Sequence, residues 1–217
     1  MNVERTADDA LPLLLLRDEL SVDRAAADAT SAADLLLPLC ALTTLGFGVH
    51  AACVAGTAWP VTGAGPALRE GLAWWAACTG GFFAAICAGL PSYWFYGVVA
   101  KVRAPAWRLA VELVRVQAVG AVILAGVVPF WLAGALGLHL VFGVEVYDSP
   151  VWMALTRALP FLCATPGVLG AYRVFGRMRA AQGHADRLPA AALTAWWMVL
   201  FLFTAPVSIH ALFVALT

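Results

Sequence analysis

Three of the four histidines in this sequence are the candidates to hold a metal ion or a haem. His50, His139 and His210 all fall within apolar stretches, toward the expected outer ends of those stretches, and His50 lies one turn from Cys53. Imidazole is a common metal ligand, and paired histidines can hold haem iron. No clustered spacing connects these residues, so we expect them to be structural or interfacial. The sequence therefore predicts no cofactor and no metal.

Charged side chains within the apolar stretches are few. Glu112 and Arg115 lie three residues apart, on one face of a helix, where they can pair with each other. Arg157 lies near the outer end of its stretch and can extend toward water. The chain has no GxSxG, HExxH or P-loop motif and no GxGxxG motif that opens a βαβ unit. These observations predict a protein that is not an enzyme.

The composition is that of a membrane protein. The chain has 217 residues, of which 63% are hydrophobic and 12% are charged, against about 25% charged in soluble domains. A soluble fold of this size cannot bury that much apolar surface. The formal net charge is zero, so no basic excess indicates a nucleic-acid partner. We expect the lipid bilayer to be the main environment of the chain.

Apolar stretches of the length that crosses a bilayer, about 20 residues, set the expected architecture. The stretches do not alternate as barrel strands do, and lipid leaves no water for unpaired backbone groups, so each must be a helix. The predicted fold is an all-α, five-span transmembrane bundle over 35–217, with spans at 35–59, 71–90 (extending to 100), 116–138, 151–175 and 190–216.

The distribution of positive charge predicts which way the spans point. If the spans alternate, eleven Lys and Arg residues lie on the side of the N-terminal segment and two, Arg69 and Arg157, lie on the other. Positive residues favour the cytoplasmic side. We therefore expect a cytoplasmic N-terminus and a C-terminus outside. The location that we expect is a bacterial cytoplasmic (inner) membrane.

Two polar segments are expected to face the cytoplasm. Residues 1–34 contain eight acidic residues and three arginines, and are predicted to be partly helical. They are the expected binding segment for other membrane or cytoplasmic proteins. A cytoplasmic basic edge is expected on the same side of the membrane, made of Lys101, Arg103, Arg108, Arg177 and Arg179.

Small residues recur every four positions in the second span, at Gly81, Ala85 and Gly89. Such residues let helix backbones approach closely in lipid. We expect them to form a helix-packing seam inside the bundle, with a homo-oligomer interface as the alternative.

The layout resembles that of Yip-family membrane proteins over residues 35–217. Ala88-Gly89-Leu90-Pro91-Ser92-Tyr93-Trp94-Phe95-Tyr96 resembles the Pro-Ser/aromatic stretch of bacterial Yip-like proteins, and Leu16-Arg17-Asp18 resembles a motif in the N-terminal segment of related bacterial proteins. In eukaryotes the resemblance implies membrane trafficking through protein partners. It implies no catalytic residue.

Together these features predict a non-enzymatic membrane subunit that acts as a scaffold, anchor or assembly partner. A small oligomeric channel or permease, with helices kinked at proline lining a path, is the alternative. A haem- or metal-bearing electron-transfer subunit is the third reading, and it depends on the three histidines alone.

Overall fold

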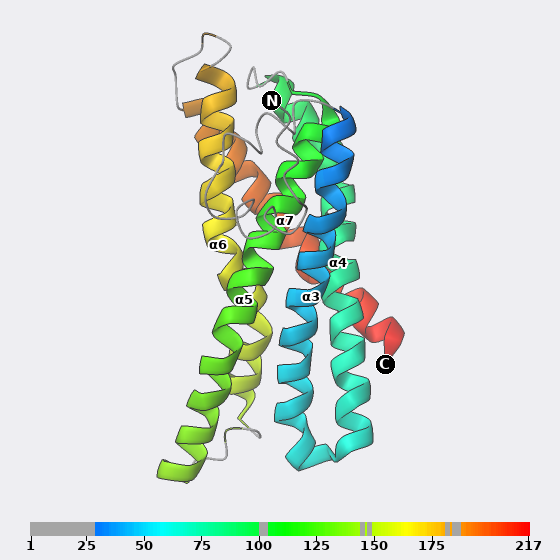
Figure 1. The fold of residues 1–217 in the computed structure, drawn as a ribbon, viewed down its shortest axis with the longest axis vertical. Helices are drawn as coiled ribbons and strands as arrows, with labels where there is room; N and C mark the ends of the chain where they lie inside the picture. The colour runs from blue at the N-terminus through cyan, green and yellow to red at the C-terminus, as the bar shows by residue number, and fades with distance from the viewer. Residues whose placement is uncertain (1–28, 100–103, 144–145, 147–148, 181–182, 184–187) are drawn as a thin grey trace, which may run out of the picture.

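The computed structural model describes residues 29–99, 104–143, 146, 149–180, 183 and 188–217. Helices make up nearly all of this part of the chain, which contains no strand. The expected all-α fold is confirmed. Figure 1 shows its helices, which are α3 (Ala29–Thr62), α4 (Ala64–Val99), α5 (Ala106–Phe142), α6 (Pro150–Ala180) and α7 (Leu188–Leu216).

Glycines in the left-handed conformation end two of these helices. Gly63 has a φ of 81° and turns the chain from α3 directly into α4. Gly143 has a φ of 63° and donates its backbone N–H to His139 O at the end of α5. Glycine is favoured at such positions because it has no Cβ to clash with the backbone. Both hairpin ends therefore have a local cause in the sequence.

Four helices have stretches long and apolar enough to cross a membrane: Asp34–Trp59, Ala64–Ser92, Ala106–Phe142 and Thr194–Leu216. The chain is therefore a multi-pass membrane protein. The remaining expected span lies in α6, which carries four arginines and is not among the four within the described residues. The third span is longer than expected, because α5 begins at Ala106 rather than near Val116.

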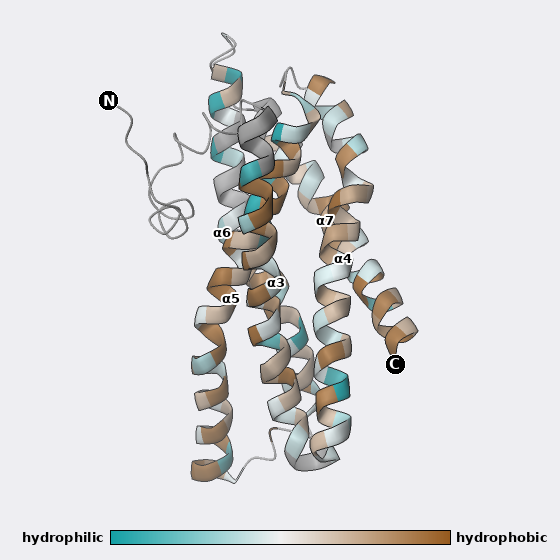
Figure 2. Ribbon diagram, turned by 45° about the vertical axis from the view of Figure 1, so that its right-hand side comes forward, coloured by the Kyte–Doolittle hydropathy of each residue, from teal (hydrophilic) through white to brown (hydrophobic). Residues whose placement is uncertain are grey.

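The helices do not pack in chain order. The most extensive contacts join α4 with α7, α3 with α5, α3 with α4, and α5 with α6. In space the order is therefore α7, α4, α3, α5, α6, with smaller contacts between α4 and α5 and between α6 and α7. Figure 1 shows α7, in orange and red, crossing the other helices obliquely. Its last turns are predominantly hydrophobic (Figure 2).

Aromatic rings fill the centre of the bundle. Phe82 of α4 is completely buried. Its ring centroid lies 4.7 Å from that of Phe47, 5.4 Å from Phe201 and 5.5 Å from Phe161, which come from α3, α7 and α6. Ring pairs at these separations add to the stability that burial supplies. The middle of the bundle is thus packed with side chains contributed by four of its helices.

Candidate functional site

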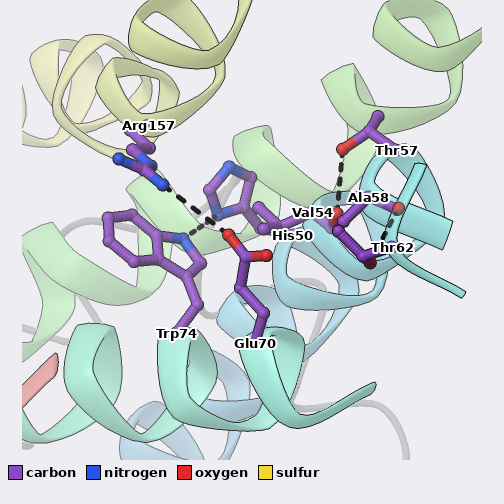
Figure 3. Close-up of polar contacts among 8 residues, drawn as sticks. All are labelled: His50, Val54, Thr57, Ala58, Thr62, Glu70, Trp74 and Arg157. Atoms are coloured by element: carbon purple, nitrogen blue, oxygen red, sulfur yellow. Dashed lines mark hydrogen bonds and ion pairs between the residues drawn. The ribbon is translucent and has the colours of Figure 1, made fainter. Parts of the chain in front are cut away.

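His50 is the centre of a buried hydrogen-bond network in the half of the bundle nearest the α3–α4 turn. It comes from α3 and is 0% exposed. Its Nε2 lies 2.9 Å from the backbone oxygen of Thr156 in α6. The indole Nε1–H of Trp74 in α4 donates to His50 Nδ1 over 3.3 Å, as Figure 3 shows. One side chain thereby connects three helices.

Thr156 extends the network to α5. Its hydroxyl donates to Trp152 O, 2.9 Å away, and accepts a hydrogen bond from Trp131 Nε1–H at 3.0 Å. The rings of Trp131 and Trp152 stack with centroids 4.2 Å apart. We call His50, Trp74, Trp131, Trp152 and Thr156 the His50 network.

The contacts of His50 fix its tautomer. An indole N–H can only donate, so Nδ1 must be the acceptor. In the neutral ring the proton is then on Nε2, which donates to the carbonyl of Thr156. Both ring nitrogens are engaged, and neither has a lone pair directed at a metal or a haem iron. The geometry is that of a histidine that joins helices.

An ion pair lies beside the network. Arg157 of α6 pairs with Glu70 of α4 at 3.6 Å, and its guanidinium carbon lies 5.8 Å from the centroid of the Trp74 ring. Figure 3 shows Glu70 directed toward Arg157, next to the Trp74–His50 pair. Cations over an indole face are attracted by its quadrupole. Arg157 therefore has two partners within the protein.

The other two histidines lie elsewhere. His139 is half-buried near the end of α5, and His210 is exposed on α7. Within the described residues no group of three or more His, Cys, Asp or Glu side chains is placed to hold a metal ion. The structure does not bring the three histidines together as ligands of one centre.

A second polar cluster lies in the opposite half of the bundle, on α5. Glu112 and Arg115 form the pair expected from their spacing, with 3.5 Å between Arg115 Nη1 and Glu112 Oε2. Both are buried, as is Gln117. The Nε2 group of Gln117 has no hydrogen-bond partner among the described residues. A buried ion pair is costly to break, because a single remaining charge is left without compensation.

The expected basic edge is only partly described, since Lys101 and Arg103 lie outside the described residues. Arg108 and Arg177 are half-buried, and Arg179 is 3% exposed. Arginine stems can pack on apolar neighbours while the head finds polar partners. The described members are therefore partly or almost wholly buried, and the basic edge as a whole stays a prediction. The acidic segment also falls almost wholly outside the described residues.

The expected seam is present at one end only. A Cβ on Gly81 would lie 2.8 Å from the backbone nitrogen of Ile209, so α4 and α7 approach closely there. Ala85 is buried, whereas nothing lies within 4 Å of a Cβ placed on Gly89. Gly89 takes no part in this close approach, although α4 and α7 also touch further along, where the ring centroids of Tyr96 and Trp196 lie 4.9 Å apart.

One face of α7 is left without a neighbour within the described residues. Phe203, Val207, His210 and Val214 are all exposed. Their spacing of four, three and four residues puts them on one side of a helix. We call these four residues the His210 face. It lies at the depth of Gly81, because Ile209 touches that residue, and this is deeper in the bundle than the sequence predicts for His210.

Sequence reasoning missed most partners in these sites. Trp74 and Trp131 each use the indole N–H in these contacts, and a tryptophan N–H that needs a partner when buried is the one signal that the sequence offers. Thr156 gives no signal in a single sequence. The closest backbone approaches also involve glycines outside the expected seam: Gly46 lies against Ala121, and Gly167 lies against Val116.

Comparison of the chain with protein-family models, curated proteins and solved structures gives no match. The resemblance to Yip-family proteins therefore stays an expectation.

Proposed function

We propose that this chain is a non-enzymatic membrane subunit that assembles with another transmembrane helix through the His210 face. The observation that carries the proposal is the exposed imidazole of His210 on an otherwise apolar helix surface. Ionisable side chains within membrane spans almost always face a bundle interior or a water-filled cavity, because lipid offers them no partner. A surface with such a group at its middle is suited to a protein partner.

The hydrogen-bonding capacity of His210 defines the partner. Within the described residues its ring makes no hydrogen bond, ion pair or ring contact. Phe203, Val207 and Val214 surround it with apolar surface. Polar side chains that bond across helices in a membrane contribute about 1–2 kcal/mol in peptides and somewhat less in folded proteins. The partner is expected to be an apolar helix with one hydrogen-bonding residue opposite His210.

The packed centre of the bundle favours the function of an assembly subunit rather than that of a channel. Phe82 and its three aromatic neighbours occupy the middle of the bundle, and the His50 network occupies the half beyond them. A path for solutes through a single copy would have to displace both.

The remaining parts of the expected topology belong to the same proposal. We propose that α6 is the fifth span, with its Arg157 paired to Glu70 and its last arginines at the cytoplasmic side. The N-terminus is then cytoplasmic and the membrane is a bacterial inner membrane. The orientation is supported by the concentration of Lys and Arg on one side of the alternating helices. The bacterial inner membrane is proposed only from the resemblance to bacterial Yip-like proteins.

Site-specific photo-crosslinking in intact membranes tests the proposal. A photoreactive residue at Val207 is expected to give a protein adduct of defined mass. The same residue at Phe130 of α5, which is 79% exposed, is the matched control and is expected to react with lipid only. The mass of the adduct tells a second copy of the chain from a different protein.

His210→Leu should reduce the adduct at Val207 severalfold while the variant still inserts and folds, because leucine suits lipid and removes only the hydrogen-bonding group. Adducts of equal yield at both positions, or lipid adducts alone at Val207, would exclude the His210 face as a protein interface.

A further inference from the structure

A cleft opens between the first turns of α4 and the last turns of α7. Its volume is about 630 Å³, and its lining includes Arg69, Glu70, Leu72, Ala76, Phe213 and Leu216. Small-molecule sites in proteins commonly have volumes of about 300–1,000 Å³. The walls are mostly apolar, with two charged residues side by side on α4. A ligand of this cleft would need an apolar part and a charged part.

The charge in the cleft is positive. Glu70 is paired with Arg157 at 3.6 Å and is directed toward it (Figure 3). Arg69 is exposed and has no carboxylate within ion-pair distance among the described residues. Among the side chains at the cleft, Glu70 is compensated by Arg157, and Arg69 carries the charge that no ion pair compensates. The complementary charge on a ligand is negative.

The position of the cleft points to a lipid rather than a soluble ligand. Leu72 and Leu216 are each 54% exposed, so the apolar walls continue onto the membrane-facing surfaces of α4 and α7. Arg69 lies near the start of the apolar stretch Ala64–Ser92, at the depth of the bilayer headgroups. The exposed indole of Trp59 lies at the same end of the bundle, as expected for an aromatic residue at the membrane interface.

We propose that this cleft binds one glycerophospholipid with an anionic headgroup, its phosphate at Arg69 and an acyl chain between Leu72, Ala76 and Phe213. Basic residues between transmembrane helices are a known means of binding anionic lipid headgroups. The inference goes beyond the proposed assembly role and does not use the His210 face.

Native mass spectrometry of the purified chain in detergent tests this inference. The protein is titrated with phosphatidylglycerol or with phosphatidylcholine of the same acyl chains. We expect one phosphatidylglycerol to be retained per chain in preference to phosphatidylcholine. Arg69→Gln should reduce that preference about fivefold, which is the effect of one basic residue near an anionic surface. Ala76→Trp should abolish retention of both lipids, because the indole fills the cleft.

Two control variants make the same substitutions at positions outside the cleft. Ala52→Trp places the same ring on an exposed position of α3 outside the cleft, and Arg173→Gln removes an exposed arginine from α6; both should behave as the unmodified protein. Equal retention of the two lipids by the unmodified protein, or unchanged retention by Ala76→Trp, would overturn the proposal. Arg69→Gln alters only an exposed charge, so it decides the headgroup claim even if Ala76→Trp does not fold.

Discussion

His50 owes its place in the bundle to partners on two other helices. Its Nδ1 accepts from Trp74 and its Nε2 donates to the Thr156 carbonyl. A buried acceptor that loses its donor keeps the full desolvation cost, about 1–3 kcal/mol. The stability of the half of the bundle nearest the α3–α4 turn should therefore depend on individual N–H groups such as that of the Trp74 indole.

Trp74→Phe tests this dependence, because it removes the N–H and keeps an aromatic ring. We expect a loss of about 1–3 kcal/mol in the free energy of unfolding, measured by unfolding in mixed micelles. Trp59→Phe is the control, since the Trp59 indole is 60% exposed. Equal stability of the two variants would contradict the network as drawn in Figure 3.

The stability of the bundle should also depend on the Phe82 ring at its centre. Phe82→Ala should cost about 3–5 kcal/mol, because it leaves a cavity among three other rings. Phe130→Ala, at a position 79% exposed, should change stability little. Thermal unfolding in detergent measures both. A small effect at Phe82 would mean that the centre is loosely packed and would reopen the channel alternative.

Contacts between side chains that lie close together in the sequence could be predicted. Glu112 and Arg115 pair as their spacing indicates. His50 was recognised as a candidate, but its partners lie 24 and 106 positions away. Nothing in a single sequence encodes which of nine tryptophans meets a histidine across the bundle. Such contacts follow from helix rotation and depth, which are set by packing.

Close backbone approach determines how pairs of helices fit. Gly81 lies directly against Ile209 of α7, whereas Gly89, two turns further along α4, faces open space. The two glycines belong to the same four-residue repeat. Substitutions at these two glycines therefore distinguish the effect of losing a helix contact from the effect of changing a residue of the repeat.

We expect Gly81→Leu to destabilise the bundle by at least about 1–3 kcal/mol, the usual range for overpacking, and Gly89→Leu to leave it within about 0.5 kcal/mol of the unmodified protein. Thermal stability in detergent is the measurement. Similar losses at both positions would show that the whole repeat is in contact, as the sequence predicts.

Helix ends could be read from the sequence where they depend on local chemistry. The turn at Gly63 falls between the first two expected spans, 35–59 and 71–90, although α3 and α4 occupy nearly all of that interval. Pro91 did not end α4, which continues to Val99. Proline removes one hydrogen bond but is tolerated inside transmembrane helices, where neighbouring groups compensate. The start of α5 was missed because buried Glu112 and Arg115 resemble a polar connector when burial is unknown.

For the whole molecule, the orientation of the chain in the membrane decides which of the proposals can hold. The cleft at Arg69 and the turn at Gly63 should face away from the cytoplasm, and the end of α6 should face it. The positive-inside distribution of Lys and Arg is the reason.

Single-cysteine labelling on a background without the five native cysteines checks this orientation. Ala64→Cys, at the α3–α4 turn, should react with an impermeant reagent in intact cells. Ala180→Cys, at the end of α6, should react only after the membrane is opened. Both positions are exposed. The reverse pattern would invert the topology, and labelling of both in intact cells would remove α6 from the spans.

The order of the helices in space has a consequence for how the protein is made. α4 finds its most extensive partner in α7, yet α7 begins at Leu188 and α4 ends at Val99, a separation of 188 − 99 = 89 positions. At about 5–20 residues per second, roughly 4–18 s of translation separate the two helices. During that interval the face of α4 with Gly81 and Phe82 must rest against lipid or a membrane chaperone. The His210 face lies on α7 and is synthesised after α3, α4, α5 and α6, so an assembly partner can recognise only a chain in which these helices have already been made.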